Sequence, residues 1–173
     1  MKNISLIGMP GSGKSTVGVL LAKELGLDFL DTDLIIQKEQ SQQLQELVDS
    51  LGADGFMDLE ARTIAALTCE GYVISPGGSV VCRPSGMERL KELGPVVYLS
   101  VPLDVLESRI LNLNTRGIAM RTEQTLGDVM VERAPLYEAY ADLTIITKAS
   151  DTAENMVSAV LDALENQKKA GTL

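Results

Sequence analysis

The residues most suited to chemistry lie in the segment 8–16, which reads GMPGSGKST. Gly8 is followed by four residues and then by Gly13, Lys14 and Ser15, the spacing of a phosphate-binding loop. In such a loop, glycines let backbone N–H groups turn toward phosphate oxygens, the lysine supplies an ammonium, and the serine offers its hydroxyl to magnesium. The alternative is an ordinary glycine-rich turn between a strand and a helix. The spacing favours a polyphosphate site.

Two carboxylates follow the next apolar segment. Asp31 and Asp33 in DFLDTD are two residues apart, so they share one face if the strand continues. Taken alone, Asp33 is a plausible helix N-cap and Asp31 a turn residue. Beside a phosphate-binding loop, both acids favour a functional role. The chain has no histidine, so proton transfer must fall to a carboxylate, lysine, tyrosine or water.

The elements that position these residues follow a βαβ rhythm. Helical segments separate five short apolar runs that read as strands: ISLIG, DFLD, YVISPGG, PVVYLS and DLTIIT. This pattern predicts an α/β fold in which a five-stranded parallel sheet carries helices on both faces and ligands gather at the carboxyl ends of the strands. The phosphate-binding loop lies at such an end.

Three helices have clear apolar stripes. The first follows the loop, with Val17, Leu20, Leu21 and Leu25 as its apolar positions and Gly26 as its stop. The second is expected to begin at a Ser41 cap and to bury Leu44, Leu47, Val48 and Leu51. The third lies near the C-terminus and is expected to bury Met156, Val157, Val160, Leu161 and Leu164.

Composition limits the function further. The 173 residues suit a single domain, and 45% hydrophobic with 23% charged residues is typical of a soluble globular protein. A net charge of −9 argues against a general nucleic-acid surface, and no apolar run is long enough for a membrane span. Cys69 and Cys82 are too far apart for a zinc or redox pair, so we expect inert thiols in a reducing compartment. We expect a cytoplasmic monomer without nucleic-acid or membrane partners.

The class of phosphate-loop protein can be narrowed by its motifs. An NKxD-like guanine motif, usual in switch GTPases, does not occur in the sequence, and the chain is too small for motor and transporter ATPases. These observations favour a compact kinase with the three-layer P-loop kinase fold.

The chain resembles the shikimate kinases over nearly its whole length. GMPGSGKST, LDFLDTD, the glycines of SPGGSV, the arginine of TRG and the segment ERAPLY occur in the order and spacing of that family. The resemblance implies an enzyme of aromatic amino acid biosynthesis that uses ATP and Mg²⁺ to phosphorylate a hydroxyl of shikimate, giving shikimate 3-phosphate. It also implies a substrate-binding segment at about 33–62 and a lid at about 112–124.

The resemblance assigns roles residue by residue. Ser15 and Asp31 would hold magnesium, Asp33 would orient the acceptor hydroxyl, and Lys14 with Arg116 of the lid would stabilise the transferred phosphoryl group. The nucleotide would be bound by Gly11, Ser12, Gly13, Lys14, Ser15, Thr16 and Arg109. Arg121 is a weaker candidate for the lid, and a solvated loop is the alternative for both lid arginines. Arg109 has an alternative as a cap for helix carbonyls.

The acceptor side depends on Arg133. Its spacing from Leu126 and Val129 places it on the apolar face of its helix, and Pro135 is expected to break that helix just afterwards. The resemblance implies that Arg133 binds the acceptor's carboxylate, and an ion pair with Glu60 or Glu132 is the alternative. Gly77 and Gly78 would bring backbone close to the acceptor, although a strand-end turn explains them as well.

The chain also departs from the family. In DGFMDLEAR, Met57 stands where the family has an arginine, while Phe56 and Glu60 keep the register. A lost carboxylate contact of this kind costs about 2–5 kcal/mol, and Arg83 is the candidate that could compensate. Further departures are Ser79 in place of a third glycine and Gly117 in place of a proline, which we expect to loosen the lid.

These departures leave other functions open. The acceptor could be another small hydroxylated metabolite, such as a sugar acid, a polyol or homoserine. A nucleotide-binding regulator that has lost turnover is the remaining alternative.

Overall fold

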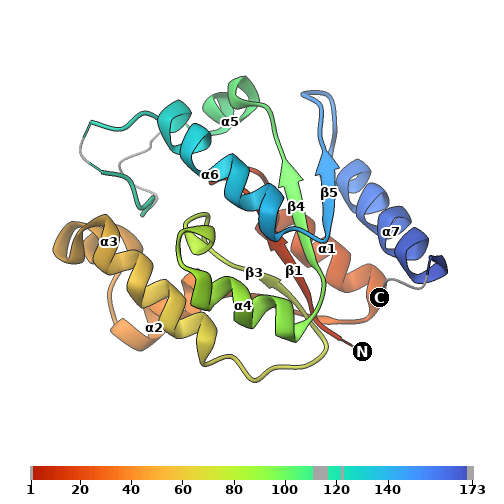
Figure 1. Ribbon diagram of the computed structural model, residues 1–173, viewed down its shortest axis with the longest axis horizontal. Helices are drawn as coiled ribbons and strands as arrows, with labels where there is room; N and C mark the ends of the chain where they lie inside the picture. The colour runs from red at the N-terminus through yellow and green to blue at the C-terminus, as the bar shows by residue number, and fades with distance from the viewer. Residues whose placement is uncertain (1, 111–116, 122, 171–173) are drawn as a thin grey trace.

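The computed structural model describes residues 2–110, 117–121 and 123–170, and its centre is a parallel sheet (Figure 1). The strands are β1 (Ile4–Ile7), β2 (Asp28–Asp31), β3 (Tyr72–Ser75), β4 (Val96–Ser100) and β5 (Leu143–Ile146). They lie in the order β2-β3-β1-β4-β5, and every neighbouring pair is parallel. The predicted five-stranded parallel sheet is confirmed.

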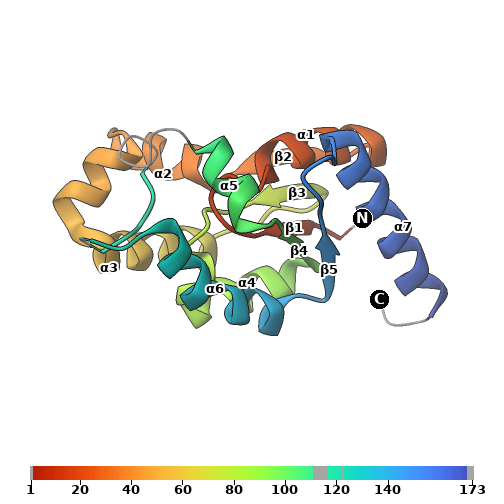
Figure 2. The ribbon, with the colours of Figure 1, turned by 90° about the horizontal axis from the view of Figure 1, so that it is seen from above.

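Helices cover both faces of this sheet, as predicted. The α-helices in the described part of the chain are α1 (Lys14–Leu25), α2 (Thr32–Gln40), α3 (Leu44–Ala65), α4 (Pro84–Leu93), α5 (Leu103–Arg109), α6 (Leu126–Tyr140) and α7 (Ala153–Lys169), and a 3₁₀ turn, η1, spans Val80–Cys82. In Figure 2, α1 and α7 lie on one face and α4 and α6 on the other. Helices α2 and α3 form a lobe at the opposite end of the molecule from α7 (Figure 1).

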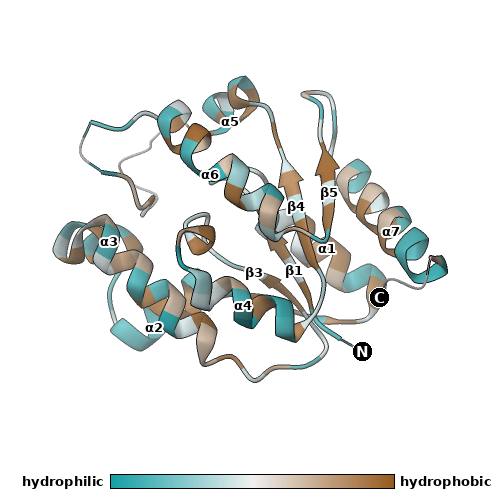
Figure 3. Ribbon diagram, in the orientation of Figure 1, coloured by the Kyte–Doolittle hydropathy of each residue, from teal (hydrophilic) through white to brown (hydrophobic). Residues whose placement is uncertain are grey.

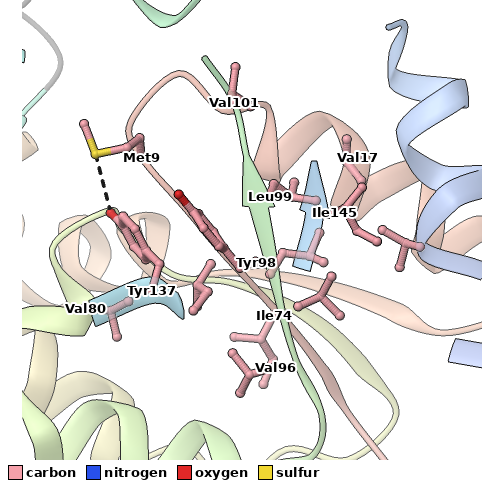
Figure 4. Close-up of a cluster of buried hydrophobic side chains, with 14 of the residues drawn as sticks. Met9, Val17, Ile74, Val80, Val96, Tyr98, Leu99, Val101, Tyr137 and Ile145 are labelled. Atoms are coloured by element: carbon pink, nitrogen blue, oxygen red, sulfur yellow. Dashed lines mark hydrogen bonds between the residues drawn. The ribbon is translucent and has the colours of Figure 1, made fainter. Parts of the chain in front are cut away.

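The strands are apolar because helices bury the sheet on both faces (Figure 3). Strands β1, β3 and β4 have almost no exposed side chains, whereas β5 is an edge strand with Ile146 81% exposed. Figure 4 shows Tyr98 of β4 beside Tyr137 of α6, and their rings stack with centroids 5.0 Å apart. This stacked pair fixes α6 against the sheet.

A smaller apolar cluster lies under α2 and α3. Its buried members come from α2, from α3 and from the segment 117–119: Ile36, Leu47, Val48, Phe56, Met57, Leu59 and Ala119. Met57 is 7% exposed within it. The segment 117–119 therefore packs against the lobe through Ala119, which belongs to this apolar cluster.

The predicted helix boundaries are correct for α1 but not for α3. Gly26 ends α1 in a left-handed conformation, as expected. Ser41, predicted to cap the next helix, instead ends α2 with φ 54°, and Gln43 is the N-cap of α3. Leu51, predicted to be buried, is 47% exposed. The reason is that Gly52, with φ 70° and ψ 170°, interrupts the helix and breaks its apolar stripe.

Pro135 does not end its helix, contrary to the prediction, since α6 continues to Tyr140. A proline removes the hydrogen bond to the carbonyl four residues earlier, which here belongs to Val131. Pro135 and Val131 are both exposed, so water can reach that carbonyl and the helix tolerates the interruption.

Two further observations concern the expected environment. Cys69 and Cys82 are free and half-buried, and burial raises the pKa of each thiol. No helix in the part of the chain that the structure describes has both the length and the apolar composition needed to cross a bilayer.

Candidate active site

A cavity of about 510 Å³ opens at the carboxyl ends of the central strands. Its walls come from the loop after β1, the starts of α1, α2 and α7, the loop after β3, the end of α5, the segment 117–119 and helices α3 and α6. The lining residues that bear on the predictions are Gly11, Gly13, Lys14, Ser15, Thr16, Asp31, Asp33, Gly77, Gly78, Ser79, Arg109 and Arg133. The fold thus brings nearly all the predicted site residues to one cavity.

The loop between β1 and α1 is built to receive an anion. Gly13 caps α1 with φ 90°, a conformation that favours glycine. The first turn of α1 has no acidic side chain, so the positive end of the helix dipole is uncompensated. Lys14 folds over the loop, and its Nζ donates to the carbonyls of Gly8 at 2.9 Å and Met9 at 3.1 Å. These features match a phosphate-binding loop.

The charge of Lys14 is sensitive to its surroundings. Burial lowers the pKa of its ammonium to about 8, and the nearby carboxylates Asp33, Glu60 and Asp31 oppose that shift. A phosphate group beside Lys14 would favour the charged form further. Lys14 is therefore suited to hold an anion, and without an anion the burial of its charge is unfavourable.

Ser15 and Asp31 meet at the cavity wall. The Ser15 hydroxyl donates to Asp31 Oδ2 at 3.0 Å, and Asp31 Oδ1 accepts from the backbone N–H of Asp33 at 3.0 Å. Asp31, and not Asp33, is thus the N-cap of α2. A hydroxyl and a carboxylate are the hard oxygen donors that Mg²⁺ prefers, and Mg²⁺ usually takes only one or two protein carboxylates beside nucleotide phosphates. The donor set fits magnesium.

Asp33 occupies the first turn of α2 and lines the same cavity. Burial is the main cause that raises its pKa to about 6; the neighbouring Asp31 adds to the shift, and Lys14 opposes it. The backbone of Gly77 passes so close that an added Cβ would lie 3.0 Å from Asp33 Oδ1 and 2.2 Å from Glu60 Oε1. Only glycine leaves both carboxylates in place.

Glu60 is a buried acid that the sequence analysis used to fix the register and named as one alternative ion-pair partner of Arg133. It is 0% exposed, and the Ser79 hydroxyl donates to its Oε2 at 2.6 Å. Its Oε1 has no hydrogen-bond partner within the described structure. Burial, and then the nearby Asp33, raises the pKa of Glu60 to about 7. The only signal in the sequence is an acid at an otherwise apolar position of α3.

Arg133 is buried, as its spacing predicted, with 2% of its surface exposed. Its Nη2 donates to the carbonyl of Ala119, and its Nη1 has no partner in the described parts of the chain. Ion pairs with Glu60 or Glu132 were the alternative, but neither acid lies within 4.0 Å of the guanidinium among the described contacts. A buried guanidinium with an open N–H at a cavity calls for an anionic ligand.

Tyr137 supports the opposite wall and was missed in the sequence. Its hydroxyl donates to the carbonyl of Gly78 at 2.5 Å, and its ring is fully buried against Tyr98. Burial raises the pKa of Tyr137 well above its usual value, so the phenol keeps its proton. The available signal was its position four residues after Arg133, on the same face of α6.

Of the three other arginines predicted for the nucleotide site or the lid, one lines the cavity, one is exposed and one lies outside the described residues. Arg109, at the end of α5, lines the cavity, and its Nη1 donates to the carbonyl of Gly11 at 3.4 Å. Arg116 lies outside the described residues. Arg121 is exposed and does not line the cavity.

Arg83 does not meet the expectation that it compensates for Met57. Its guanidinium pairs with Asp58 at 2.6 Å and Asp54 at 3.1 Å, and it is absent from the cavity wall. Both acids are exposed, so the cation is held at the surface of α3.

Gly117 also differs from the expectation. We expected it to loosen the lid, but its N–H donates to Gln45 Oε1 at 3.1 Å, and an added Cβ would lie 2.3 Å from the Cβ of Leu44. With φ 60°, this glycine permits a close contact between the segment 117–119 and the start of α3.

Comparisons with known proteins agree with this geometry. The sequence profile described as Shikimate kinase matches residues 10–165. The shikimate kinase of Rippkaea orientalis is 34% identical over 94% of this chain and 87% of its own length, and that of Thermodesulfovibrio yellowstonii is 34% identical over 99% and 100%.

Solved structures also show the similarity to shikimate kinases. The shikimate kinase from Acinetobacter baumannii, solved in complex with shikimate, superposes with a TM-score of 0.89 at 32% identity, covering 97% of this chain and 95% of that one. A gluconokinase from Sinorhizobium meliloti, with a TM-score of 0.56 and 17% identity over 98% of this chain and 94% of its own, shares the fold. The profile match and the curated relatives show that the chain belongs to the shikimate kinase family.

Proposed function

We propose that this chain is an ATP-dependent kinase that transfers the γ-phosphoryl group to a ring hydroxyl of shikimate, giving shikimate 3-phosphate. The observation that carries the proposal is Arg133: a buried guanidinium with an open N–H faces the same cavity as the phosphate-binding loop. An acceptor with a carboxylate supplies the anion that Arg133 lacks. The relatives named above, one of them solved with shikimate, supply the identity of the acid.

The nucleotide half of the proposal rests on the start of α1. The backbone of residues 11–16 would hold the phosphates of ATP at the positive end of the helix, and Arg109 would contact the nucleotide from α5. Ser15 and Asp31 would hold magnesium, which when bound neutralises charge on the phosphates. Lys14 would release the loop carbonyls it now contacts and neutralise charge on the transferred group.

The acceptor half rests on Asp33 and Arg133. Arg133 would fix the carboxylate of the acceptor, and Asp33 would accept the proton of the attacking hydroxyl and orient its oxygen toward the loop. A pKa of about 6 leaves Asp33 largely ionised at neutral pH and more basic than an ordinary aspartate. Gly77 and Gly78 would let the backbone approach the acceptor, with Tyr137 holding the carbonyl of Gly78. A further cation from Arg116 stays a prediction from the resemblance.

ADP release in the presence of ATP and magnesium tests the proposal. The panel of acceptors should include shikimate, a sugar acid, a polyol and homoserine, with the product identified by mass spectrometry and ³¹P NMR. We expect shikimate to give the highest kcat/KM, with one phosphate on a ring hydroxyl. A higher kcat/KM for another acceptor would show that Met57 accompanies a changed specificity. ATP binding without stimulation by any acceptor would indicate a regulator.

A further inference from the structure

Ser79 is a polar side chain of the cavity wall at a position where the resemblance predicts a third glycine. It follows Gly77 and Gly78, lines the cavity and is 3% exposed. Its hydroxyl donates to Glu60 Oε2 at 2.6 Å, which is within the range of a charge-assisted O–H···O⁻ bond. Above pH 7, where Glu60 is mostly ionised, the only proton of the hydroxyl is therefore committed to Glu60.

Glu60 keeps that arrangement fixed. The carboxylate is 0% exposed and does not itself line the cavity. Its second oxygen lies against the backbone of Gly77, where an added Cβ would be only 2.2 Å away, so only glycine at position 77 leaves the carboxylate in this place. Within the described structure, Ser79 is the only side chain that hydrogen-bonds to Glu60. Glu60 consequently acts on the cavity through Ser79.

A hydroxyl with a committed proton presents only its lone pairs to a ligand. Ser79 then accepts hydrogen bonds and does not donate them. On the same cavity, Asp33 is also an acceptor, whereas Arg133 Nη1 is an open donor. Besides Lys14 and Arg109, which we assign to the nucleotide, the cavity thus offers two acceptors and one cationic donor to the second substrate. The ligand that satisfies all three groups is an acid that carries at least two hydroxyls.

We propose that Ser79 is a specificity-determining residue that accepts a hydrogen bond from a hydroxyl of the acceptor other than the one phosphorylated. This inference rests on the proposed function, which assigns the reacting hydroxyl to Asp33 and the carboxylate to Arg133. It adds a third point of recognition, provided by a side chain that a glycine at this position cannot supply. Glu60 is a positioning residue in this arrangement, because it orients the Ser79 hydroxyl without touching the ligand.

The test compares wild type with Ser79→Ala on shikimate and on deoxy analogues, each lacking one of the ring hydroxyls that is not phosphorylated. For shikimate, Ser79→Ala should raise KM about three- to tenfold, the value of one neutral hydrogen bond, while kcat and the KM for ATP stay within about twofold. For one of the analogues, the wild type should already show the raised KM, and Ser79→Ala should add nothing. Ser79→Thr, which keeps the hydroxyl, should retain the wild-type preference.

Three results would overturn the proposal. One is an unchanged KM for shikimate in Ser79→Ala. Another is an equal rise in KM for shikimate and for every deoxy analogue, which would indicate a role in folding alone. The third needs no variant: a wild-type enzyme that uses all the analogues as well as shikimate has no such contact, so the test holds even if Ser79→Ala fails to fold.

The wild type alone reports on the proposed function. If it prefers another hydroxy acid to shikimate, the proposed acceptor is wrong, and the Ser79 comparison is made with that acid and its deoxy analogues. If the wild type phosphorylates no acid of the panel, both proposals fail.

Discussion

Replacing Arg133 by methionine removes the cation that we assign to the acceptor's carboxylate while keeping an unbranched side chain of similar length. Arg133 is 2% exposed, and its Nη1 has no partner among the described residues. Any carboxylate bound there is shielded from water, which makes the contact strong. Arg133→Met should therefore weaken binding of shikimate much more than binding of ATP.

The size of the effect follows from the cavity wall. Loss of one partner from a buried, hydrogen-bonded charge pair costs about 2–5 kcal/mol, or about 30- to 5,000-fold in affinity. Among the described arginines, Arg109 and Arg133 line the cavity, and Arg109 lies at the phosphate-binding loop. Met57 supplies no second cation, and Arg83 is held by Asp54 and Asp58. We therefore expect the upper half of that range, a rise of about 400-fold or more in KM for shikimate.

The assay is steady-state kinetics in which each substrate is varied in turn. Arg109→Met is the matched control: it removes a cation from the nucleotide side of the same cavity and should raise the KM for ATP instead. Arg133→Lys keeps the charge but loses the planar fork, so it should be intermediate. An Arg133→Met variant whose KM values for ATP and shikimate rise equally, or whose KM for shikimate stays within threefold of wild type, would refute the assignment.

Three other substitutions test separate parts of the site. Burial raises the pKa of Glu60 from 4.5 to about 7. The contribution of Glu60 to the free energy of unfolding is therefore fully present below pH 4.5 and is lost as the pH rises through about 7. In urea unfolding between pH 5 and 8, the free energy of unfolding of Glu60→Gln should accordingly rise relative to that of wild type by up to about 3 kcal/mol. A difference between the two proteins that does not change with pH would contradict the raised pKa of Glu60. Gly77→Ala should lower kcat/KM for shikimate at least tenfold with the KM for ATP unchanged, because the new Cβ displaces two carboxylates; parallel changes for both substrates would show a general disruption. Met57→Arg should lower the KM for shikimate and the melting temperature together, since it adds a cation but breaks an apolar cluster, and an unchanged KM would show that position 57 does not reach the ligand.

Much of the fold could be predicted because its signals are local. The strand segments around Ile4, Asp28, Tyr72, Val96 and Leu143 are short apolar runs, and all of them became strands of one parallel sheet. The errors came from single residues whose effect depends on tertiary context. Ser41 is a good N-cap by type but ends a helix here, and Pro135 is tolerated because it faces water. The periodicity of α3 could not reveal the interruption at Gly52.

The candidate site likewise has parts that could be predicted from the sequence and parts that could not. The placement of Asp33 beside the loop before α1, at one cavity, could be predicted because these residues are close in the sequence. The hydrogen bond between Ser79 and Glu60 joins residues 19 apart, and that between Tyr137 and Gly78 joins residues 59 apart. No spacing rule links such pairs, since their contact is set by how α3 and α6 pack around the loop after β3. Arg83 shows the converse: its type suited an anion site, but two exposed acids of α3 hold it at the surface.

The central claim is that Asp33 orients an acceptor hydroxyl beside a phosphate-binding loop that works independently of it. The most direct measurement is therefore turnover and ATP affinity of Asp33→Asn, which keeps the shape of the side chain and removes its charge. We predict a fall of about 10²- to 10⁴-fold in kcat with shikimate, while the Kd for ATP with magnesium stays within about threefold. Equal losses of turnover and ATP affinity, or near-normal turnover, would contradict the account.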